Sequence, residues 1–283
     1  MRFFLLVFIT LVAFAANSVL ARLALKEMSS QAASTPISFT LARLFFGAIM
    51  LLIIIRPDPN FLRKDWRQAC ALFLYALFFS VSYVLTDAGT GALILFGAVQ
   101  ITMLTGGFIS GERLSPRQII GASLAALGLI ILLGPTASTP LASAAGLMVL
   151  SGVSWGIYSL MGRSGVNPAL QTSENFIKAA LLAALLCGPY LFFRPEPAMT
   201  SSALALAAAS GAITSGLGYV LWYHVLKSLS ASRAAISQLS VPALAAIGGV
   251  LFLAEPITPI FILASVLILG GVAFAVLKSG QTP

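Results

Sequence analysis

Long apolar stretches, separated by short polar or proline-containing connections, repeat along almost the whole chain. Each stretch has roughly 17–25 residues, enough for a helix to cross a hydrocarbon core of about 30 Å. The pattern predicts an all-α polytopic membrane protein with ten transmembrane helices. These helices are expected at residues 3–23, 37–55, 68–86, 90–110, 117–134, 142–162, 171–193, 203–226, 233–254 and 258–277.

Composition and charge agree with a protein that lies almost wholly in a bilayer. Of its 283 residues, 59% are hydrophobic and 8% are charged, too few charges for a soluble surface. With the N-terminus inside, 11 of the 16 basic residues fall on the inner side of the ten helices and 3 on the outer side. Cytoplasmic loops collect Lys and Arg, so both termini are expected in the cytoplasm of a bacterial-type inner membrane. The net charge of +8 then indicates contact with anionic lipid and not nucleic-acid binding.

The N-terminus has a second interpretation. Arg2, the apolar run that follows and the sequence Ala13-Phe14-Ala15 resemble a secretory signal with its cleavage site. The run continues past that site to Leu20, which favours a first transmembrane helix. The two cysteines, Cys70 and Cys187, each fall in a predicted helix and are too few for a disulfide framework.

One pattern occurs twice along the chain. Residues 111–133 and 254–276 align at an offset of 143, which pairs Glu112 with Glu255 and Pro116 with Pro259. Two such copies predict a tandem duplication, with one repeat at 1–138 and the other at 139–283. Because each repeat has five helices, an odd number, the second is expected to be inverted, with a binding cavity between the two.

The connections also carry helix-start signals. Ser115-Pro116 and Thr258-Pro259 each place a hydroxyl residue before a proline, which predicts that the fifth and tenth helices begin there. Glu112 and Glu255 precede these starts, so each is expected to lie at the positive end of the helix that follows it.

These features resemble the EamA family of the drug/metabolite transporter superfamily. The resemblance rests on the doubled E-(R/P)-(L/I)-(S/T)-P element, the ten helices, and the segments 87–100 and 151–163. It implies two inverted five-helix halves around a central cavity, alternating access, and often the export of metabolites or amino acids. The expected function is therefore a secondary active transporter, with a facilitated-diffusion channel or uniporter as the alternative. Its expected partners are the bilayer, a small-molecule substrate and protons as a coupling ion, while the oligomeric state stays open.

Charged residues inside the predicted helices are the first candidates for function, because charge within a bilayer usually faces a cavity or a partner. Arg43 is expected either to pair with Asp87 and close the outer side, or to gate the substrate. Glu174 and Lys178 have the i,i+4 spacing of an ion pair, and Lys178 facing the cavity could bind a substrate carboxylate. Proton coupling needs a titrating group, for which the candidates are Asp87, Glu174 and His224.

Aromatic and uncharged polar residues complete the candidate site. Trp155, Tyr158 and Tyr219 are expected to face the cavity and stack on an organic substrate. Trp222, Tyr223 and His224 lie near the inner boundary, where an aromatic belt is the commoner explanation. The uncharged polar candidates, which could equally hold helices together, are Asn17, Tyr83, Gln100, Asn175 and Gln238.

Several other functions find little support in the sequence. No Walker element, metal-ligand cluster or cofactor motif is present, so no cofactor is expected. Residues 152–156 match G-x-S-x-G, the signature of a serine hydrolase, but they lie within an apolar helix and not on a strand-to-helix turn. Gly152 and Gly156 also make an ordinary helix-packing face. An intramembrane serine hydrolase is therefore disfavoured, and no enzymatic activity is predicted.

Overall fold

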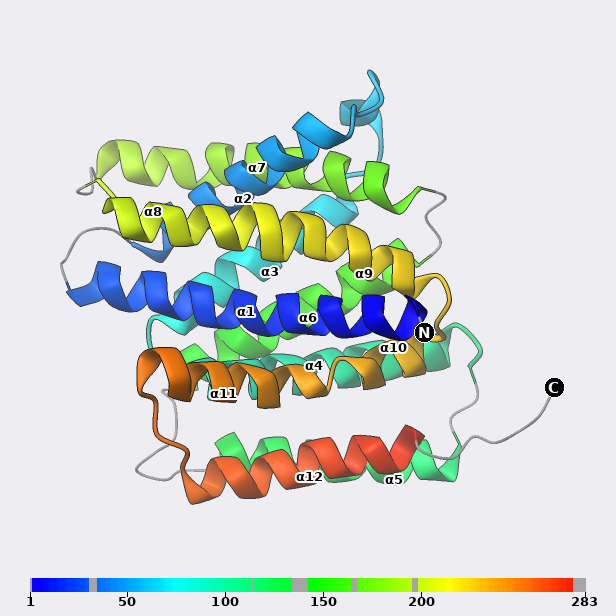
Figure 1. Ribbon diagram of the computed structural model, residues 1–283. Helices are drawn as coiled ribbons and strands as arrows, with labels where there is room; N and C mark the ends of the chain where they lie inside the picture. Colours follow the sequence, from blue (N-terminus) through cyan, green and yellow to red (C-terminus); the bar gives the residue numbers. More distant parts are fainter. Residues whose placement is uncertain are drawn as a thin grey trace.

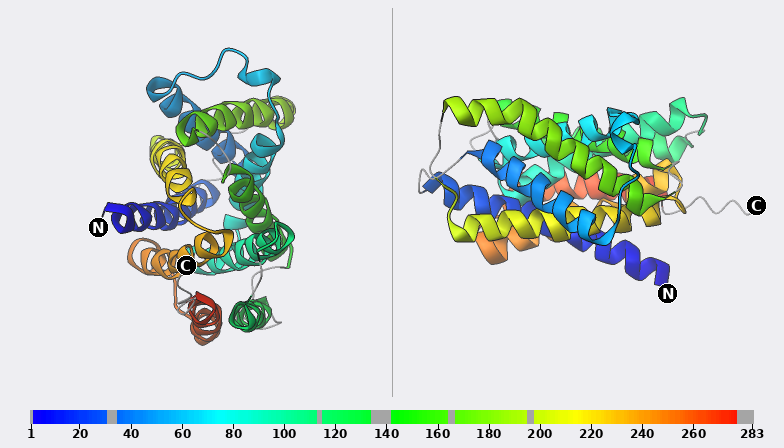
Figure 2. Two further views of the ribbon diagram at one scale, coloured as in Figure 1. Left: turned by 90° about the vertical axis from the view of Figure 1, so that its right-hand side faces the viewer. Right: turned by 90° about the horizontal axis from the view of Figure 1, so that it is seen from above.

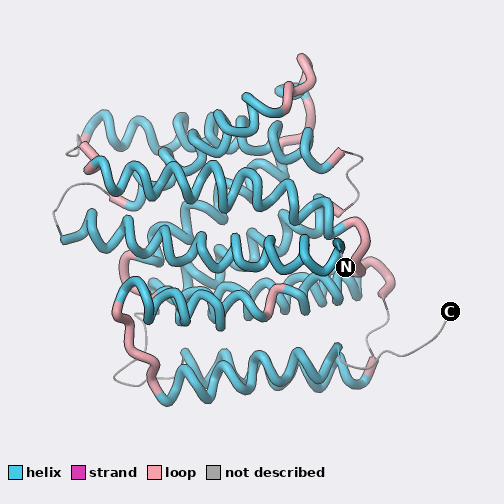
Figure 3. Tube along the Cα trace, viewed as in Figure 1, coloured by secondary structure: helices cyan, strands magenta, loops and turns pink. Residues whose placement is uncertain are grey.

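A computed structural model describes residues 2–30, 35–112, 115–133, 142–163, 167–194 and 198–276. Regular structure within these ranges is entirely helical (Figure 3). The helices of the first half are α1 (Arg2–Ser30), α2 (Pro36–Ile54), the short η1 (Phe61–Arg63), α3 (Arg67–Tyr83), α4 (Ala88–Ile109) and α5 (Pro116–Leu133). Those of the second half are α6 (Ala142–Gly162), α7 (Pro168–Phe193), α8 (Ser201–Ala208), η2 (Ala209–Leu217), α9 (Gly218–Leu226), α10 (Ala231–Ser237), α11 (Ser240–Leu253) and α12 (Pro259–Val276). The predicted boundary between the repeats, at residue 138, lies outside the described residues.

A helix or a run of helical segments occupies each of the ten predicted stretches. Within the described residues, seven of these are long and apolar enough to cross a membrane. The helices α3, α5 and α12 fall outside that set, and α3 has only 17 residues. Both predicted starts at Ser-Pro and Thr-Pro are confirmed: the Ser115 hydroxyl accepts from the Gln118 N–H at 3.3 Å, and the Thr258 hydroxyl from the Phe261 N–H at 3.2 Å.

Two of the ten stretches are not continuous α-helices. The eighth passes from α8 through the π-helical turns of η2 into α9. The ninth is interrupted between Ser237, the last residue of α10, and Ser240, the first of α11. Pro242 contributes to this break, because its nitrogen carries no hydrogen and cannot donate to the carbonyl of Gln238, four residues earlier. Both irregular segments lie in the second half, and both present polar groups to the interior.

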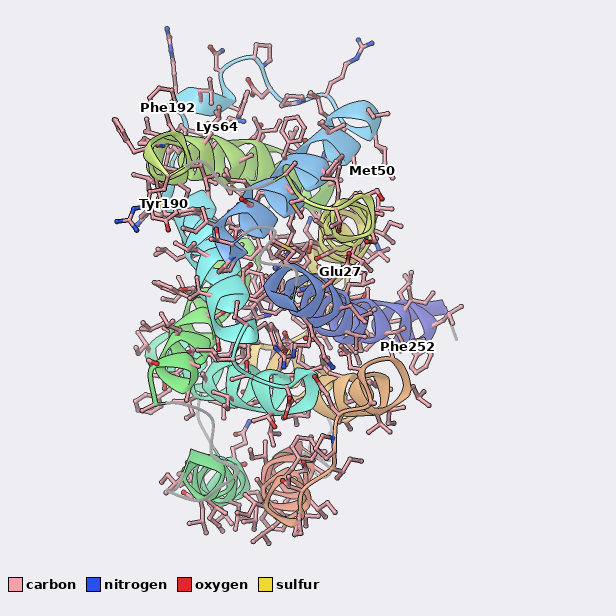
Figure 4. All side chains as sticks on the ribbon, turned by 90° about the vertical axis from the view of Figure 1, so that its left-hand side faces the viewer. Glu27, Met50, Lys64, Tyr190, Phe192 and Phe252 are labelled. Atoms are coloured by element: carbon pink, nitrogen blue, oxygen red, sulfur yellow. The ribbon has the colours of Figure 1, made fainter. Side chains whose placement is uncertain are left out.

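The two halves pack against each other in equivalent ways. Helix α1 packs on α11, and its counterpart α6 packs on α4, while α2 packs on α7 and α5 on α12. The α5–α12 pair lies at one edge of the bundle, and these two helices contact each other much more than they contact any other helix (Figures 1 and 2). Large apolar side chains such as Tyr190, Phe192 and Phe252 point outward around the rim of the bundle (Figure 4). The described residues thus form a bundle with an apolar exterior and a partly polar centre.

Candidate functional site

A small cavity lies at the centre of the bundle, where α1, α3, α4, α6 and α9 meet. Its free volume is about 10 Å³, close to what a single water molecule requires. Side chains therefore nearly fill the space, and the residues that line it are all buried. The aromatic and amide residues in its wall are Phe14, Asn17, Tyr75, Phe79, Phe96, Trp155 and Tyr219.

The aromatic rings form a continuous cluster contributed by both halves of the chain. Trp155 of α6 lies with its ring centroid 4.5 Å from that of Tyr219 and 5.1 Å from that of Tyr75. Phe14 of α1 contacts Trp155 edge-on at 5.3 Å. Such rings offer both flat apolar faces and polar edges to an organic molecule.

Arg43 of α2 lies beside this cluster and is only 1% exposed. Its Nη2 donates to the Tyr219 hydroxyl at 2.9 Å and to the Tyr75 hydroxyl at 3.1 Å. Nε donates to the Ser215 hydroxyl at 3.1 Å, and the guanidinium lies 4.8 Å from the centroid of the Phe79 ring. The expected Arg43–Asp87 ion pair is wrong, because Asp87 pairs instead with Arg22 of α1.

Asn17 organises the other side of the Arg43 cluster. Its Oδ1 accepts from the hydroxyls of Ser210 at 2.7 Å and Thr214 at 3.2 Å, while its Nδ2 donates to the Tyr75 hydroxyl at 3.3 Å. Ser210, Thr214 and Ser215 all lie in η2. The π-helical turns thereby aim three hydroxyls at α1 and α2, in keeping with the frequent location of such turns at functional sites.

Close backbone contact explains why glycine occupies this part of η2. A Cβ at Gly211 would fall on the backbone carbonyl of Arg43, and one at Gly47 would collide with the Phe176 ring. The absence of both side chains lets α2 and η2 approach closely enough for Arg43 to reach Ser215.

At one end of the bundle, Glu255 joins α4, α1 and the α11–α12 connection. Its Oε2 accepts from the Ala88 N–H, the first residue of α4, at 2.8 Å, and its Oε1 lies 3.3 Å from Arg22 Nε. Arg22 Nη1 also donates to the carbonyls of Tyr83 and Val84 at the end of α3, each at 2.8 Å. Burial raises the pKa of Glu255, against the opposing effects of the Ala88 N–H and of Arg22.

At the opposite end, Glu112 makes the equivalent set of contacts. Its Oε1 accepts from the Ala231 N–H, the first residue of α10, at 3.2 Å and lies 3.3 Å from Arg163 Nη1. Its Oε2 accepts from the Ser232 hydroxyl at 3.1 Å. Burial acts to raise the pKa of Glu112, but these hydrogen bonds and Arg163 outweigh it and hold the pKa below its ordinary value.

The two glutamates thus do not lie at the helix each precedes in sequence, and that expectation is wrong. Each caps the other repeat: Glu112, after α4, binds the start of α10, whereas Glu255, after α11, binds the start of α4. A left-handed residue directly before each glutamate turns the chain back, Gly111 with φ 88° and Ala254 with φ 53°. We call these two sets of contacts the Glu112 closure and the Glu255 closure.

Comparison with known proteins shows to which family this chain belongs. The sequence profile of the EamA-like transporter family matches residues 1–134 and again residues 142–277. The chain belongs to the EamA-like transporter family. It is therefore a multi-pass membrane transporter with a small-molecule substrate and not an enzyme, as the doubled motif predicted.

Relatives within the family share nearly the whole length of the chain. An uncharacterized protein of Pseudomonas aeruginosa is 46% identical over 275 residues, which cover 96% of this chain and 93% of that protein. The aromatic amino acid exporter YddG of Ancylobacter novellus is 25% identical over 290 residues, 95% of this chain and 96% of that protein. A crystal structure with a TM-score of 0.67 and 23% identity, covering 95% of this chain and 97% of its own, has the same fold.

Within the EamA fold, the predicted Glu174–Lys178 ion pair is also wrong. Glu174 Oε1 lies 3.0 Å from Lys64 Nζ, and Lys178 Nζ donates to the backbone carbonyl of Asp65 at 2.9 Å. Lys178 also lies 5.5 Å from the centroid of the Trp66 ring. Both α7 residues therefore hold the α2–α3 connection, and neither lines the central cavity.

The remaining polar candidates lie around the cavity and not in its wall. Gln238, at the break before α11, accepts from the Trp155 indole N–H at 2.8 Å and so fixes the orientation of that ring. Gln100 donates to the Ala235 carbonyl, and Tyr83 donates to the Ala88 carbonyl at 3.2 Å, near the Glu255 closure. Asn175 is buried in α7.

Of the three residues expected in an aromatic belt at the inner boundary, two are buried and one is exposed. Trp222 and Tyr223 are fully buried, so they do not form an interfacial belt: the Trp222 indole donates to the Ser159 hydroxyl at 3.2 Å, and the Tyr223 hydroxyl donates to the Tyr158 carbonyl at 2.8 Å. Tyr158 is itself buried behind Trp155, at a ring-centroid distance of 5.5 Å. His224 is exposed on α9, away from the cavity wall.

Sequence reasoning missed Phe14, Tyr75, Phe79 and the hydroxyls of η2. One signal could have found part of this group: Tyr75, Phe79 and Tyr83 are spaced four residues apart along α3 and so share a face. No comparable signal exists for Ser210, Thr214 and Ser215, because their common orientation depends on the π-helical turns.

Proposed function

We propose that this protein is a secondary active transporter that exports small amphipathic metabolites, such as amino acids, by alternating access between two inverted five-helix halves. The observation that carries the proposal is the pair of equivalent closures toward opposite ends of the bundle, with the nearly filled central cavity between them. A fixed pore needs no such pair. Alternating access requires that one end open while the other stays shut, and inverted repeats supply one closure for each end.

The closures also suggest how the movement is coupled. The Glu255 closure ties the start of α4 to α1, and the Glu112 closure ties the start of α10 to α6 through Arg163. Helix α4 begins in the Glu255 closure and is followed by Glu112, and the α10–α11 segment begins in the Glu112 closure and is followed by Glu255. When the contacts of one closure break, these helices are therefore free to tilt about the closure that remains. The substrate then reaches the aromatic cluster from the side whose closure has opened.

The distribution of basic residues supports an orientation in a bacterial inner membrane. In the topology predicted from the sequence, 11 Lys and Arg residues fall on the inner side and 3 on the outer side, which supports cytoplasmic termini, with the Glu112 closure facing inward and the Glu255 closure facing outward. Similarity to the aromatic amino acid exporter YddG of Ancylobacter novellus supports export as the direction of transport. Protons are the proposed coupling ion, and Asp87, 3.7 Å from Arg22 in the Glu255 closure, is the predicted coupling residue best placed to act.

The test is substrate release from proteoliposomes loaded with a mixed pool of amino acids and other metabolites, read by mass spectrometry with and without a pH gradient. Selective, protein-dependent release that accelerates with the gradient supports a proton-coupled carrier. Release that ignores the gradient indicates facilitated diffusion instead. A matched control is Trp155→Ala, which removes a cavity ring; unchanged release of every compound from that variant contradicts transport through the central cavity.

A further inference from the structure

Within the part of the chain that the structure describes, Arg43 carries a buried positive charge that has no negative partner. Among the described residues, no carboxylate lies within 4.0 Å of its guanidinium, and its Nη1 has no hydrogen-bond partner. The groups that contact its other nitrogens, Ser215, Tyr75 and Tyr219, are neutral hydroxyls. A buried charge is stable only when paired and fully hydrogen-bonded, so the cluster lacks an anion.

The hydrogen bonds around Arg43 point to the same deficit. The Tyr75 hydroxyl oxygen takes donors from Arg43, from Asn17 and from Tyr219, at 3.1, 3.3 and 3.1 Å. The amide oxygen of Asn17, Oδ1, already accepts from two hydroxyls within 3.2 Å. Donors outnumber acceptors, and an ionised carboxylate, which only accepts hydrogen bonds, is the group that such a cluster fits.

The neighbouring cavity determines what the rest of the ligand can be. Two of the hydroxyls that Arg43 contacts belong to Tyr75 and Tyr219, whose rings lie in the cavity wall with those of Trp155 and Phe14. No aspartate or glutamate is among the described residues of the wall, so an ammonium group that entered the cavity would find no opposite charge there and would be repelled by Arg43. An apolar or aromatic body, in contrast, can replace ring–ring contacts when the side chains part.

We propose that Arg43, with the Tyr75 and Tyr219 hydroxyls, is the anion subsite of the cavity, and that the ligand is an organic carboxylate with an aromatic or apolar body, its amino group not required. This inference rests on the proposed transport function and specifies its substrate class. It also assigns the carboxylate to Arg43 and not to Lys178, whose ammonium group is held by carbonyls of the α2–α3 connection.

The first experiment needs no variant. Full-length protein in lipid nanodiscs is titrated with 3-phenylpropanoate, its neutral amide, phenylalanine and 2-phenylethylamine, and thermal unfolding is recorded for each. The two carboxylates are expected to raise the unfolding midpoint, and the amide and the amine to leave it unchanged. Equal stabilisation by the amine or the amide overturns the proposal, as does stabilisation by phenylalanine alone or an equal effect of chloride or inorganic phosphate.

Arg43→Gln then tests the residue itself. Because hydrogen bonds to charged groups are the stronger ones, binding of 3-phenylpropanoate is expected to weaken about 10- to 100-fold. Without ligand, the variant is expected to unfold at or above the temperature of the unsubstituted protein, because an unpaired buried charge has been removed. A purely structural arginine predicts the reverse, a lower midpoint with the response to carboxylates retained, and that result overturns the proposal.

Two further variants keep the test decisive. Arg67→Gln makes the same change at a side chain that is 81% exposed, and it is expected to bind like the unsubstituted protein. If Arg43→Gln does not fold, Tyr75→Phe removes one hydroxyl of the subsite and keeps the ring; unchanged selectivity for the acid over the amide then overturns the proposal. If the acid binds but is not released from proteoliposomes, the proposed transport function is contradicted. If amines are released and acids are not, only the assignment of a carboxylate substrate is contradicted.

Discussion

Weakening one closure should shift the protein toward a state open at that end. Glu255→Gln keeps the size of the side chain but replaces one carboxylate oxygen by an NH2 donor, so the side chain can no longer accept hydrogen bonds from both Arg22 and the Ala88 N–H. Glu112→Gln makes the same change opposite Arg163. Because the two closures lie at opposite ends, the two substitutions are expected to act in opposite directions.

The magnitudes follow from the exposure of each pair. The Arg22 and Glu255 side chains are 15% and 9% exposed, so losing a largely desolvated, charge-assisted contact costs about 1.5–3 kcal/mol. That corresponds to a change of about 10- to 100-fold in the open population. The Arg163 and Glu112 side chains are 27% and 28% exposed, so solvent screening reduces the effect of Glu112→Gln to about 1 kcal/mol, roughly fivefold.

The assay measures access to the cavity from each side of the membrane. Ser18, in the cavity wall, is replaced by Cys in a background where Cys70 and Cys187 are Ala. A membrane-impermeant thiol reagent is then applied to right-side-out or inside-out vesicles. Glu255→Gln should speed labelling from outside, and Glu112→Gln should speed labelling from inside, each by the factor given above.

The double variant is the internal control, since its ratio of outside to inside labelling should return toward that of the unsubstituted closures. Faster labelling from the same side in both single variants refutes the assignment of the closures to opposite ends. Labelling rates that do not change in either variant refute their role in holding the cavity shut.

Three further predictions concern backbone strain, close packing and pH. Ala254→Gly should raise the free energy of unfolding by about 1 kcal/mol, because φ is 53° there, whereas the same change at Ala245, inside α11, should lower it by a similar amount. Gly211→Ala should lower it by about 1–3 kcal/mol and abolish release from proteoliposomes, because its Cβ would fall on the backbone of α2. Acidification should favour the inward-open state, because the pKa of Glu112 is lowered where its closure is formed, so protonation of Glu112 weakens that inner closure. Spin-label distances across both ends, followed as the pH falls below the ordinary pKa of a glutamate, should lengthen at the inner end only.

Much of the site was accessible from the sequence because charged residues, Trp and Tyr are scarce in this chain, which has 3 Trp and 6 Tyr. Arg43, Trp155 and Tyr219 stand out for that reason, and all three lie at or beside the cavity. Their partners could not be found in this way. A one-dimensional pattern indicates which residues share a helix face, but it does not indicate which other helix covers that face, so Lys178 looked as suitable as Arg43.

The sequence by itself determined the membrane location, the succession of ten helical stretches and the duplication, because hydropathy, helix caps and repeats are local properties of the chain. It also singled out Glu112 and Glu255 as equivalent. Only the tertiary structure decided what these residues contact. Each glutamate binds a helix start more than a hundred residues away, and the hydroxyls that surround Arg43 come from three different helices. Contacts of that kind depend on helix packing, in which small residues such as Gly211 set how closely the backbones approach.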